Sequence, residues 1–545
     1  MEWIIQQVNQ IDACIKERHV GSILEKVLQL NGDSQLDTAY PLNDFMLFKD
    51  SQKVLDRIEK AIVDNEKIVI YGDYDCDGIM ATSILVRAFE KRHVQVGYHI
   101  PDRFKDGYGL NVSRVEEMSK KGYSLIITVD NGISAYDAIE RANELGMDVI
   151  VTDHHDLPDT LPNAYGIIHT QISENYPFKA ICGGFVACKL ATALLGHQDP
   201  YIYCMAALAT VGDMMPMKNE NRTLVKRALE VMSQEKYMSF ELLLGENQQY
   251  NMTSLGFSLA PKINSVGRLV ESLNPNKCVT YFRHEKAYSE AERDFKLQFA
   301  SKCQELNQQR QKLTTTQYEI AKKNMQDLNG ILVSSSHEFH EGLVGLVAGK
   351  MMNQFYRPTF IANYDASTEI YKGSARSVPG FNIHEALNAL SDDLLVFGGH
   401  ERAGGFSVEK GKWPKFIDHL EKYANEHLKE EDLIEKQYAI LLETNEIRLS
   451  NVKELELLSP YGMENEEPIF YLKCPKPTKI ETLSQGKHLK LTFDLEMAQL
   501  QVLYFNHGDL YTQVQGLNEI ELFGQLSINK FRNFENIQMI LKDIR

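Results

Sequence analysis

The feature that most constrains the fold of this chain is a regular alternation of short β-rich runs with helical segments. The runs at residues 67–71, 124–129 and 148–152 are rich in Ile and Val, and helical patterns at 81–91 and 135–145 separate them. Strands that alternate with helices form parallel sheets, because each helix returns the chain to the end of the sheet where the next strand begins. The sequence therefore predicts an α/β domain built on a parallel sheet.

Each of the three runs is followed by acidic residues. The carboxyl ends of parallel strands share one edge of a sheet, so we expect these side chains to meet in one crevice. Carboxylates so close together would repel one another unless divalent cations offset their charge. Oxygen ligands with one or two imidazoles suit Mn²⁺ or Mg²⁺, and no thiolate is placed to favour zinc. The residues concerned are Asp73, Asp75 and Asp77 after the first run, Asp130 after the second, and Asp153, His154 and His155 after the third.

Each of these signals has an ordinary explanation when it is taken singly. An aspartate after a strand, such as Asp130, is most often the N-cap of the next helix. The Asp-x-Asp-x-Asp-Gly pattern at 73–78 is also typical of a turn or a calcium loop, although no Glu follows at the twelfth position of an EF-hand loop. Adjacent histidines occur by coincidence on surfaces. Three such signals at successive strand ends favour a metal site.

The rest of the chain divides into further units. Residues 276–329 contain neither Gly nor Pro, and apolar residues recur at heptad spacing from Phe299 to Ile320. We expect most of this stretch to form one long helix, although two packed helices with a break fit the same pattern. Short alternating runs near the C-terminus predict a small β-barrel or sandwich. The predicted units are an N-terminal segment at 1–60, an α/β domain at 61–275, a connecting helix at 276–329, a second, smaller α/β domain at 330–428 and a β domain at 450–545.

The charge balance bears on which ligands the chain can bind. Its formal net charge is −17, from 58 basic and 75 acidic residues, the opposite of the usual basic footprint of a nucleic-acid-binding protein. A groove needs only local positive charge, however, and bound cations would offset acidic groups where phosphate approaches. The charge balance is therefore compatible with a nucleic-acid ligand.

Cysteine usage and hydropathy indicate where such a chain would work. The 8 cysteines are scattered, and none forms a Cys-x-x-Cys pair, which is typical of a reducing cytoplasm. The N-terminus has no basic segment followed by an apolar core, and no apolar run approaches the roughly 18 residues of a membrane span. We expect a soluble cytoplasmic protein with no membrane partner.

Three motifs, taken together, resemble the signature of the DHH phosphoesterase superfamily. They are YGDYDCDG at 71–78, TVDNG at 128–132 and TDHH at 152–155. Further segments narrow the resemblance to the RecJ family of bacterial single-strand-specific exonucleases. These segments are CGG at 182–184, TVGD at 210–213 with Pro216, PKINSVGR at 261–268, GSARS at 373–377, GGH at 398–400, YGMEN at 461–465 and HLK at 488–490. The resemblance implies a DHH domain, a smaller DHH-associated α/β domain joined to it by the long helix, and a C-terminal OB-like β-barrel.

The resemblance also implies a two-metal centre that holds Mn²⁺ or Mg²⁺. One cation would lower the pKa of a bound water so that hydroxide attacks phosphorus, and the pair would stabilise the charge on the attacking and leaving oxygens. His155 would be a further ligand or a close catalytic partner, Asp153 would orient a histidine, and Asp73 would have a supporting role. The ligands carried over by position are Asp75, Asp77, Asp130, His154 and Asp213.

A second set of residues resembles the family's contacts to the nucleic-acid strand. An arginine can donate two parallel hydrogen bonds to a phosphate, and neighbouring hydroxyls can contact the remaining oxygens. An arginine between two serines is more often structural when it stands alone, so this assignment comes from the resemblance. Residues similar to the family's pocket for a 5′-terminal phosphate are Arg268, Ser374, Arg376 and Ser377, and His400 is similar to a residue of its loop over the scissile group.

The chain departs from the family pattern at three places. The usual HPGVIG segment is HEGLVG at 340–345, the usual Ala-Ala-Gly is Ala-Gly-Gly at 403–405, and the expected Asn-Pro is His169-Thr170. None of these changes removes a proposed metal ligand. They bear on strand contact and processivity and not on catalysis.

Three functions are compatible with these motifs. The resemblance favours a 5′→3′ exonuclease on single-stranded DNA in recombination and repair, acting as a monomer and with a helicase and single-strand-binding protein as possible partners. Hydrolysis of oligonucleotides or cyclic dinucleotides is an alternative, but such small substrates do not need an OB-like domain. A non-catalytic single-strand-binding relative is a third, and the intact acidic cluster argues against it.

Overall fold

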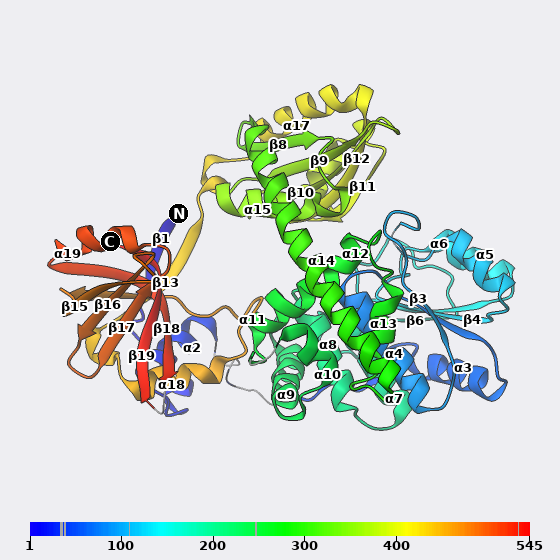
Figure 1. Ribbon diagram of the computed structural model, residues 1–545, viewed down its shortest axis with the longest axis horizontal. Helices are drawn as coiled ribbons and strands as arrows, with labels where there is room; N and C mark the ends of the chain where they lie inside the picture. Colours follow the sequence, from blue (N-terminus) through cyan, green and yellow to red (C-terminus); the bar gives the residue numbers. More distant parts are fainter. Residues whose placement is uncertain (33–35, 37–39, 108, 246–247, 532–533) are drawn as a thin grey trace.

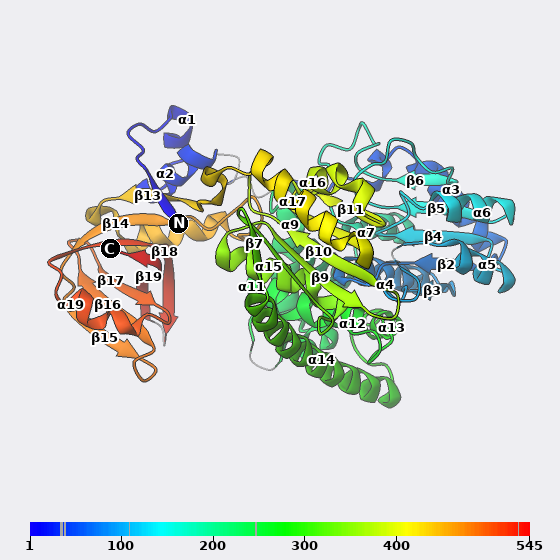
Figure 2. The same cartoon turned by 90° about the horizontal axis from the view of Figure 1, so that it is seen from above.

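The computed structural model describes residues 1–32, 36, 40–107, 109–245, 248–531 and 534–545, and its elements form three bodies (Figure 1). The first α/β domain and the second are joined by a long helix, and the C-terminal β domain lies to one side of both. Viewed from above, the long helix runs along the flank of the two α/β domains (Figure 2). None of the helices in these described ranges is both long and apolar enough to cross a membrane.

The first domain is built on a five-stranded, wholly parallel sheet with the order β3-β2-β4-β5-β6. Alternate residues of the central strands enter two cores: Ile68 and Ile70 pack under α3, α4, α7 and α8, whereas Val69 and Tyr71 pack under α5 and α6. The predicted parallel sheet is confirmed. The elements are α3 (Ser51–Val63), β2 (Ile68–Tyr71), α4 (Cys76–Lys91), β3 (Gly97–His99), α5 (Val112–Lys120), β4 (Leu125–Val129), α6 (Tyr136–Glu144), β5 (Asp148–Thr152), β6 (Gly166–Ile168), α7 (Gly183–Leu195), α8 (Pro200–Gly212), α9 (Asn219–Glu235), α10 (Met238–Leu244), α11 (Met252–Ser254), α12 (Ala260–Arg268) and α13 (Asn276–Phe282).

The connecting helix α14 (Glu290–Lys323) covers most of the stretch 276–329, as expected, but not its N-terminal part. The short helix α13 precedes it, so the alternative of a break in the pattern holds at the N-terminal end. Ser289 ends the break as the N-cap of α14, where its side chain accepts a hydrogen bond from the amide of Glu292. The buried ammonium of Lys296 donates to the carbonyl oxygen of Tyr281 in α13 and to that of His284 in the following loop, the latter at 2.8 Å. This tertiary contact stabilises the break without any Gly or Pro.

The second α/β domain has a six-stranded mixed sheet with the order β11-β12-β10-β9-β8-β7. Helices α16 and α17 pack on one face, and α15 with the C-terminal end of α14 packs on the other. The end of α14 thereby belongs to the core of this domain. Its elements are β7 (Gln326–Leu328), β8 (Ile331–Ser336), α15 (Val344–Phe355), β9 (Thr359–Asp365), β10 (Ile370–Arg376), α16 (Ile383–Ala389), β11 (Val396–His400), β12 (Ala403–Glu409) and α17 (Trp413–His427).

The C-terminal β domain begins earlier than the expected residue 450 and includes the N-terminus of the chain. Its sheet has the order β1-β13-β14-β18-β19-β17-β16-β15, in which β1 pairs in parallel with β13. Both termini therefore lie in this domain (Figure 1, Figure 2). The elements are β1 (Glu2–Gln6), α1 (Ala13–Lys16), α2 (Ser22–Asn31), β13 (Lys436–Leu442), α18 (Leu449–Glu454), β14 (Phe470–Pro475), β15 (Lys479–Leu483), β16 (His488–Asp494), β17 (Gln499–Tyr504), α19 (Tyr511–Gln515), β18 (Glu519–Phe531) and β19 (Phe534–Ile544).

The expected N-terminal unit at 1–60 is therefore divided between two domains. Ile23, Leu24 and Val27 of α2 are buried in the core of the β domain, whereas Val54 and Ile58 of α3 are buried in the first α/β domain. The pairing of β1 with β13 joins residues more than 400 positions apart. No local pattern can reveal a pairing of this kind, since it depends on the folded positions of the other elements.

Candidate active site

The loop after β2, at the carboxyl edge of the parallel sheet, carries three of the predicted acidic residues. Asp75 is the N-cap of α4, and its carboxylate accepts a hydrogen bond from the amide of Gly78 at 3.1 Å. Asp77 lies in the first turn of α4, and both it and Asp73 are buried. Carboxylates at these positions are stabilised by the positive end of the helix dipole. The loop therefore keeps three carboxylates close to one end of α4.

Asp130 follows β4 in the left-handed backbone region, with a φ of 61°. The side-chain amide of Asn131 holds this turn, because it donates to the carbonyl oxygens of Val129 at 2.9 Å and of Tyr71 at 3.2 Å. The N-cap of the next helix is Ala135, so the alternative explanation of Asp130 as a helix cap is wrong. The carboxylate of Asp130 is available to the acidic cluster.

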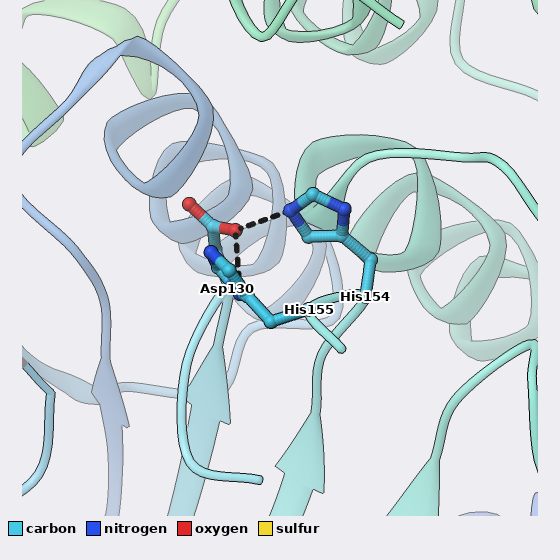
Figure 3. A group of neighbouring side chains, drawn as sticks. All are labelled: Asp130, His154 and His155. Atoms are coloured by element: carbon cyan, nitrogen blue, oxygen red, sulfur yellow. Dashed lines mark ion pairs between the residues drawn. The ribbon is translucent and has the colours of Figure 1, made fainter. Parts of the chain in front are cut away.

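The two histidines after β5 lie against the carboxylate of Asp130. Nε2 of His154 is 3.1 Å from Oδ1 of Asp130, and Nδ1 of His155 is 4.0 Å from the same oxygen (Figure 3). Nε2 of His154 also lies 3.5 Å from Oδ2 of Asp77 and 3.7 Å from Oδ2 of Asp213. One imidazole nitrogen thus faces carboxylates from three separate segments of the chain.

Asp153 supports the histidines and does not face the cluster. Its carboxylate accepts hydrogen bonds from the amides of His154 at 2.7 Å and Ile133 at 3.0 Å, and lies 2.7 Å from Nδ1 of His155. Burial opposes its ionisation, but these contacts, above all that with His155, hold the pKa of Asp153 at about 2. The contact also raises the pKa of His155 to about 9, against the effect of burial. Asp153 therefore fixes the position of His155.

The Cys-Gly-Gly motif places the N-terminus of α7 against Asp77. The carboxylate of Asp77 accepts hydrogen bonds from the amides of Gly183 at 2.8 Å and Gly184 at 2.6 Å. A Cβ atom on Gly184 would lie 2.5 Å from Cβ of Ala209, and one on Gly183 would lie 2.6 Å from Cβ of Asp130. Only glycine permits so close an approach. The motif therefore packs α7 under the cluster and orients Asp77.

The cluster fits divalent cations. Oδ1 of Asp73 and Oδ1 of Asp130 are buried and accept no hydrogen bond from any residue that the structure describes. Burial and then the neighbouring carboxylates raise the pKa values of both groups, and raise that of Asp213 to about 9. Cations would supply the missing partners and offset the charge. Three sets of possible ligand atoms each lie within 4.8 Å: Asp73, Asp75 and Asp130; Asp77, His154 and Asp213; and Asp130, His154 and His155.

The thiols near the cluster are not metal ligands in this arrangement. Burial, and then the adjacent carboxylates, raise the pKa values of Cys76 and Cys182 well above their usual range. A neutral thiol is a poor ligand, because metals bind the thiolate. The remaining set of carboxylates and imidazoles suits Mn²⁺ or Mg²⁺.

Comparisons with known proteins identify the domains. The family model for the DHH family, N-terminal domain, matches residues 67–212, that for the DHHA1 domain matches 328–426, and that for the RecJ OB domain matches 439–543. The single-stranded-DNA-specific exonuclease RecJ of Bacillus subtilis (strain 168) is 35% identical, over 100% of this chain and 70% of that protein. The chain belongs to the RecJ family.

Other RecJ proteins are similar over most of their length. RecJ of Escherichia coli (strain K12) is 29% identical over 90% of each chain. The crystal structure of RecJ in complex with Mn²⁺ from Thermus thermophilus matches with a TM-score of 0.84 at 26% identity, over 100% of this chain and 79% of that chain. The Mg²⁺ complex of the same protein matches with a TM-score of 0.78 at 25% identity, over 100% of this chain and 78% of that chain. The fold expected from the resemblance, with DHH, DHH-associated and OB-like domains, is confirmed.

Two of the residues that resemble the RecJ phosphate pocket meet where the two α/β domains touch. Arg376 ends β10, and its Nη1 donates to Oγ of Ser374 at 2.8 Å. Its guanidinium lies against the first turn of α15, where a Cβ atom on Gly345 would be 3.0 Å from Nη2. Arg268 ends α12 in the first domain, and its Nη1 donates to the carbonyl oxygen of Gly342 at 3.3 Å. The two arginines thus approach the same turn from different domains.

Ser377 does not join this pocket, contrary to the expectation from the motif. It is 1% exposed, its amide donates to the carbonyl oxygen of Arg402 at 3.0 Å, and its hydroxyl donates to that of Val378 at 3.2 Å. In an extended strand successive side chains point to opposite faces, so the residue after Arg376 turns into the domain. Ser374, two residues before Arg376, lies on the same face as the arginine.

Two further arginines lie near the pocket, and the sequence reasoning missed both. The positive charges of Arg103 and Arg310, after the effect of burial, help lower the pKa of Arg268 to about 10. Arg103 lies in the loop after β3, with its guanidinium 5.3 Å from the ring centre of Tyr74. Arg310 lies in the middle of α14. Neither position stands out in a single sequence, because a loop arginine and a helix arginine are ordinary surface residues.

His400 and His169 connect the histidine loop to other parts of the molecule. Nδ1 of His400, at the end of β11, is 2.8 Å from Oδ2 of Asp156, so the second domain reaches the loop that carries His154 and His155. Nε2 of His169 is 2.8 Å from the carbonyl oxygen of His155. The histidine that stands in place of the family's Asn at position 169 therefore contacts this loop.

Proposed function

We propose that this chain is a single-stranded-DNA-specific exonuclease that hydrolyses phosphodiester bonds in the 5′→3′ direction with two divalent cations, in DNA recombination and repair. The observation that carries this proposal is the convergence of Asp77, Asp130, Asp213 and His154 at the edge of the parallel sheet. The relatives named single-stranded-DNA-specific exonuclease support it, since the similarity extends over the whole chain for the B. subtilis protein and over 90% of it for the E. coli protein.

Mn²⁺ or Mg²⁺ would be held by the oxygen and nitrogen atoms of the cluster. Bound cations would supply an acidic water and offset charge on the reacting phosphate. The protein contributes the geometry: α7 orients Asp77, the Asn131 turn holds Asp130, and Asp153 fixes His155. The T. thermophilus RecJ structures with Mn²⁺ and Mg²⁺ support both ions as candidates. The proposed ligands are Asp75, Asp77, Asp130, His154 and Asp213, with His155 as a ligand or close partner.

The arginines favour recognition of a terminal phosphate, in keeping with the 5′→3′ direction that the RecJ resemblance implies. A terminal phosphomonoester carries up to one more negative charge than an internal diester and has an additional free oxygen. Arg268 and Arg376, with the hydroxyl of Ser374, offer donors in a half-buried setting, where Coulomb attraction is stronger than in water. A strand held there by its 5′-phosphate would present its first internal bonds to the cluster, and His400 lies beside the loop that carries the two histidines.

A large cavity between the three bodies offers a path for the rest of the strand. Its volume is about 1730 Å³, and its lining includes Phe257, Tyr356, Arg402, Tyr438 and Lys542. Exposed aromatic rings and basic side chains suit unpaired bases and their backbone. A cyclic dinucleotide would not need this space, and a non-catalytic binding protein would not need the acidic cluster. Both alternatives are therefore weaker.

The compartment, the oligomeric state and the protein partners are also part of the proposal. We infer that the enzyme acts as a cytoplasmic monomer on strands that a helicase separates and a single-strand-binding protein covers. The free thiol state of all its cysteines supports a reducing compartment.

The test is hydrolysis of single strands labelled at the 5′ or the 3′ end, in Mn²⁺, in Mg²⁺ and in EDTA. We expect the 5′ label to be released first as a small product, and the 3′ label to remain on long fragments until late in the reaction. EDTA should abolish hydrolysis. Early release of the 3′ label would contradict the proposed direction, and full activity in EDTA would contradict the metal mechanism.

A further inference from the structure

The connecting helix α14 carries a hydrogen-bonded polar pair, Arg310 and Asn307. Arg310 lies at the middle of this helix, and both its Nε and its Nη2 donate to Oδ1 of Asn307, at 3.1 Å and 2.9 Å. Asn307 is 6% exposed. Two hydrogen bonds from one guanidinium to one oxygen restrict the arginine more than a single bond would. The orientation of Arg310 is therefore built into the helix.

The position of α14 brings Arg310 toward the residues already assigned to the phosphate pocket. The helix packs on α12, which ends at Arg268, and on α15, whose first turn contacts Arg376. Figure 1 shows α14 passing from the first domain into the second beside both of these helices. Arg268 has Arg103, Arg310 and Arg376 as positively charged neighbours. Arginines from the first domain, the connecting helix and the second domain therefore converge on one region.

The hydrogen bonds of these arginines within the described ranges go to neutral groups. Arg310 and Arg376 donate to an amide oxygen, a hydroxyl and a carbonyl oxygen, and Arg268 donates to a carbonyl oxygen. The negative charge of Asp75 acts on Arg268, but that carboxylate belongs to the metal cluster. Half-buried guanidiniums that hydrogen-bond neutral groups keep their charge for an incoming anion. A phosphate dianion is the anion of matching charge and geometry at the end of a DNA strand.

We infer that Arg310 is a specificity-determining residue of the terminal-phosphate pocket and that Asn307 is the positioning residue that aims its guanidinium. This inference rests on the proposed exonuclease function. Asn307 suits the role because its amide oxygen accepts both hydrogen bonds without adding charge. An aspartate at the same place would make the same contacts but would neutralise the arginine and weaken its attraction for phosphate.

The test compares 5′-phosphorylated and 5′-hydroxyl single strands, with KM and kcat measured separately for each. Loss of a charge-assisted hydrogen bond costs a factor of about ten or more, so Arg310→Ala should raise KM for phosphorylated strands by about tenfold and change KM for hydroxyl strands much less. Asn307→Ala should shift KM in the same direction by a smaller factor. Asn307→Asp should shift KM at least as much as Asn307→Ala, although it retains the acceptor.

Matched controls separate this role from general support of the helix. Gln308→Ala and Gln311→Ala change exposed residues of the same helical turn and should leave the ratio of the two KM values unchanged. Equal losses on both substrates in Arg310→Ala and Asn307→Ala would overturn the inference, and so would an Asn307→Asp variant that behaves like the unmodified protein. If Arg310→Ala does not fold, Arg310→Lys replaces it, because lysine retains the charge and the aliphatic part of the side chain. Arg310→Lys should show a reduced preference for 5′-phosphorylated over 5′-hydroxyl strands.

Arg376→Ala distinguishes failure of the inference from failure of the proposed function. It should lower use of phosphorylated strands by about 10- to 150-fold. If Arg376→Ala shows this selective loss and Arg310→Ala does not, the pocket stands and only the role of Arg310 is refuted. If neither variant discriminates between the two ends, or the unmodified protein does not degrade from the 5′ end, the phosphate pocket and the inference are both refuted.

Discussion

At the scale of single residues, hydrogen bonding distinguishes two buried carboxylates of the site, Asp153 and Asp130. Asp153 has its oxygens occupied by backbone amides and by His155. Oδ1 of Asp130, in contrast, has no hydrogen-bond donor among the described residues, although it is buried. A buried carboxylate oxygen without a donor is costly, so such an oxygen is a candidate metal ligand. Of these two aspartates, which are similarly buried, Asp130 is therefore the candidate ligand.

This difference leads to a prediction for Asp130. We expect Asp130→Ala to lower the single-turnover rate on single-stranded DNA by about a hundredfold or more, as is typical when one charge-stabilising group is removed. Binding of a labelled strand should remain measurable, because affinity comes mainly from distributed backbone contacts. Asp137→Ala, at an exposed position of the following helix, is the control and should retain activity. A rate for Asp130→Ala above about a tenth of the original would exclude a ligand role.

At the scale of elements, the connecting helix depends on a buried lysine near its N-terminus. Nζ of Lys296 donates to Oγ of Ser239 at 3.0 Å, to the carbonyl oxygen of His284 at 2.8 Å and to that of Tyr281. Lys296 is fully buried. These bonds attach α14 to the loop that precedes it and to α10. A polar contact in the core therefore determines where the long helix begins.

Lys296 also gives α14 a predicted pH dependence. Burial lowers the pKa of Lys296 to about 8, while Glu292 and Glu285 oppose this effect. Lysine in an unfolded chain titrates near pH 10.4, so the unfolded state binds more protons between about pH 8 and pH 10. Stability contributed by this residue should therefore rise with pH across that window. Below pH 8 Lys296 is protonated in both the folded and the unfolded state, so its contribution to the free energy of unfolding should not change with pH.

The measurement is urea unfolding of the unmodified protein and of Lys296→Ala at pH 8 and pH 10. Lys296→Ala should lower the free energy of unfolding by roughly 2–4 kcal/mol, because it leaves buried acceptors unpaired and creates a cavity. The difference in unfolding free energy between the unmodified protein and Lys296→Ala should be larger at pH 10 than at pH 8. Lys312→Ala, at an exposed position of the same helix, should show neither effect. A gap that narrows at pH 10 would refute the assigned direction of the pKa shift.

At the scale of the whole molecule, the N-terminal strand β1 packs into the C-terminal β domain. Trp3 of β1 stacks on Phe523 with ring centres 4.6 Å apart, and its Nε1 donates to Asp543 at 2.9 Å. The β domain also contacts the first domain, where the amide of Met217 donates to the carbonyl oxygen of Met463 at 2.7 Å. The three bodies therefore surround the cavity proposed as the strand path, and β1 helps to hold the β domain beside it.

Removal of this anchor should affect long substrates most. Trp3→Ala should destabilise the β domain by about 2–4 kcal/mol, since large aromatic truncations in packed sites cost that much. Degradation of long single strands should then slow more than that of short oligonucleotides, because the β domain contributes contacts away from the metal cluster. Ile5→Ala changes an exposed residue of the same strand and serves as the control. Equal slowing on long and short strands would instead indicate a role in folding alone.

Local patterns in the sequence were sufficient for the parallel sheet and for most of the acidic cluster. Strand periodicity places Asp75, Asp130 and His154 at strand ends, and parallel strands bring those ends to one edge. Asp213 and the proposed phosphate-binding residues entered only through the family resemblance, because an aspartate after a helix and an arginine in a strand carry no distinctive local signal.

Only the tertiary structure decided the remaining features. The pairing of β1 with β13, the break before α14, the inward direction of Ser377 and the nearness of Arg103 and Arg310 to Arg268 depend on contacts between residues far apart in the chain. Local sequence determines backbone preference and the face on which a side chain lies. Which faces meet is determined by packing of the whole molecule, because burial and pairing are properties of the assembled elements and of no single segment.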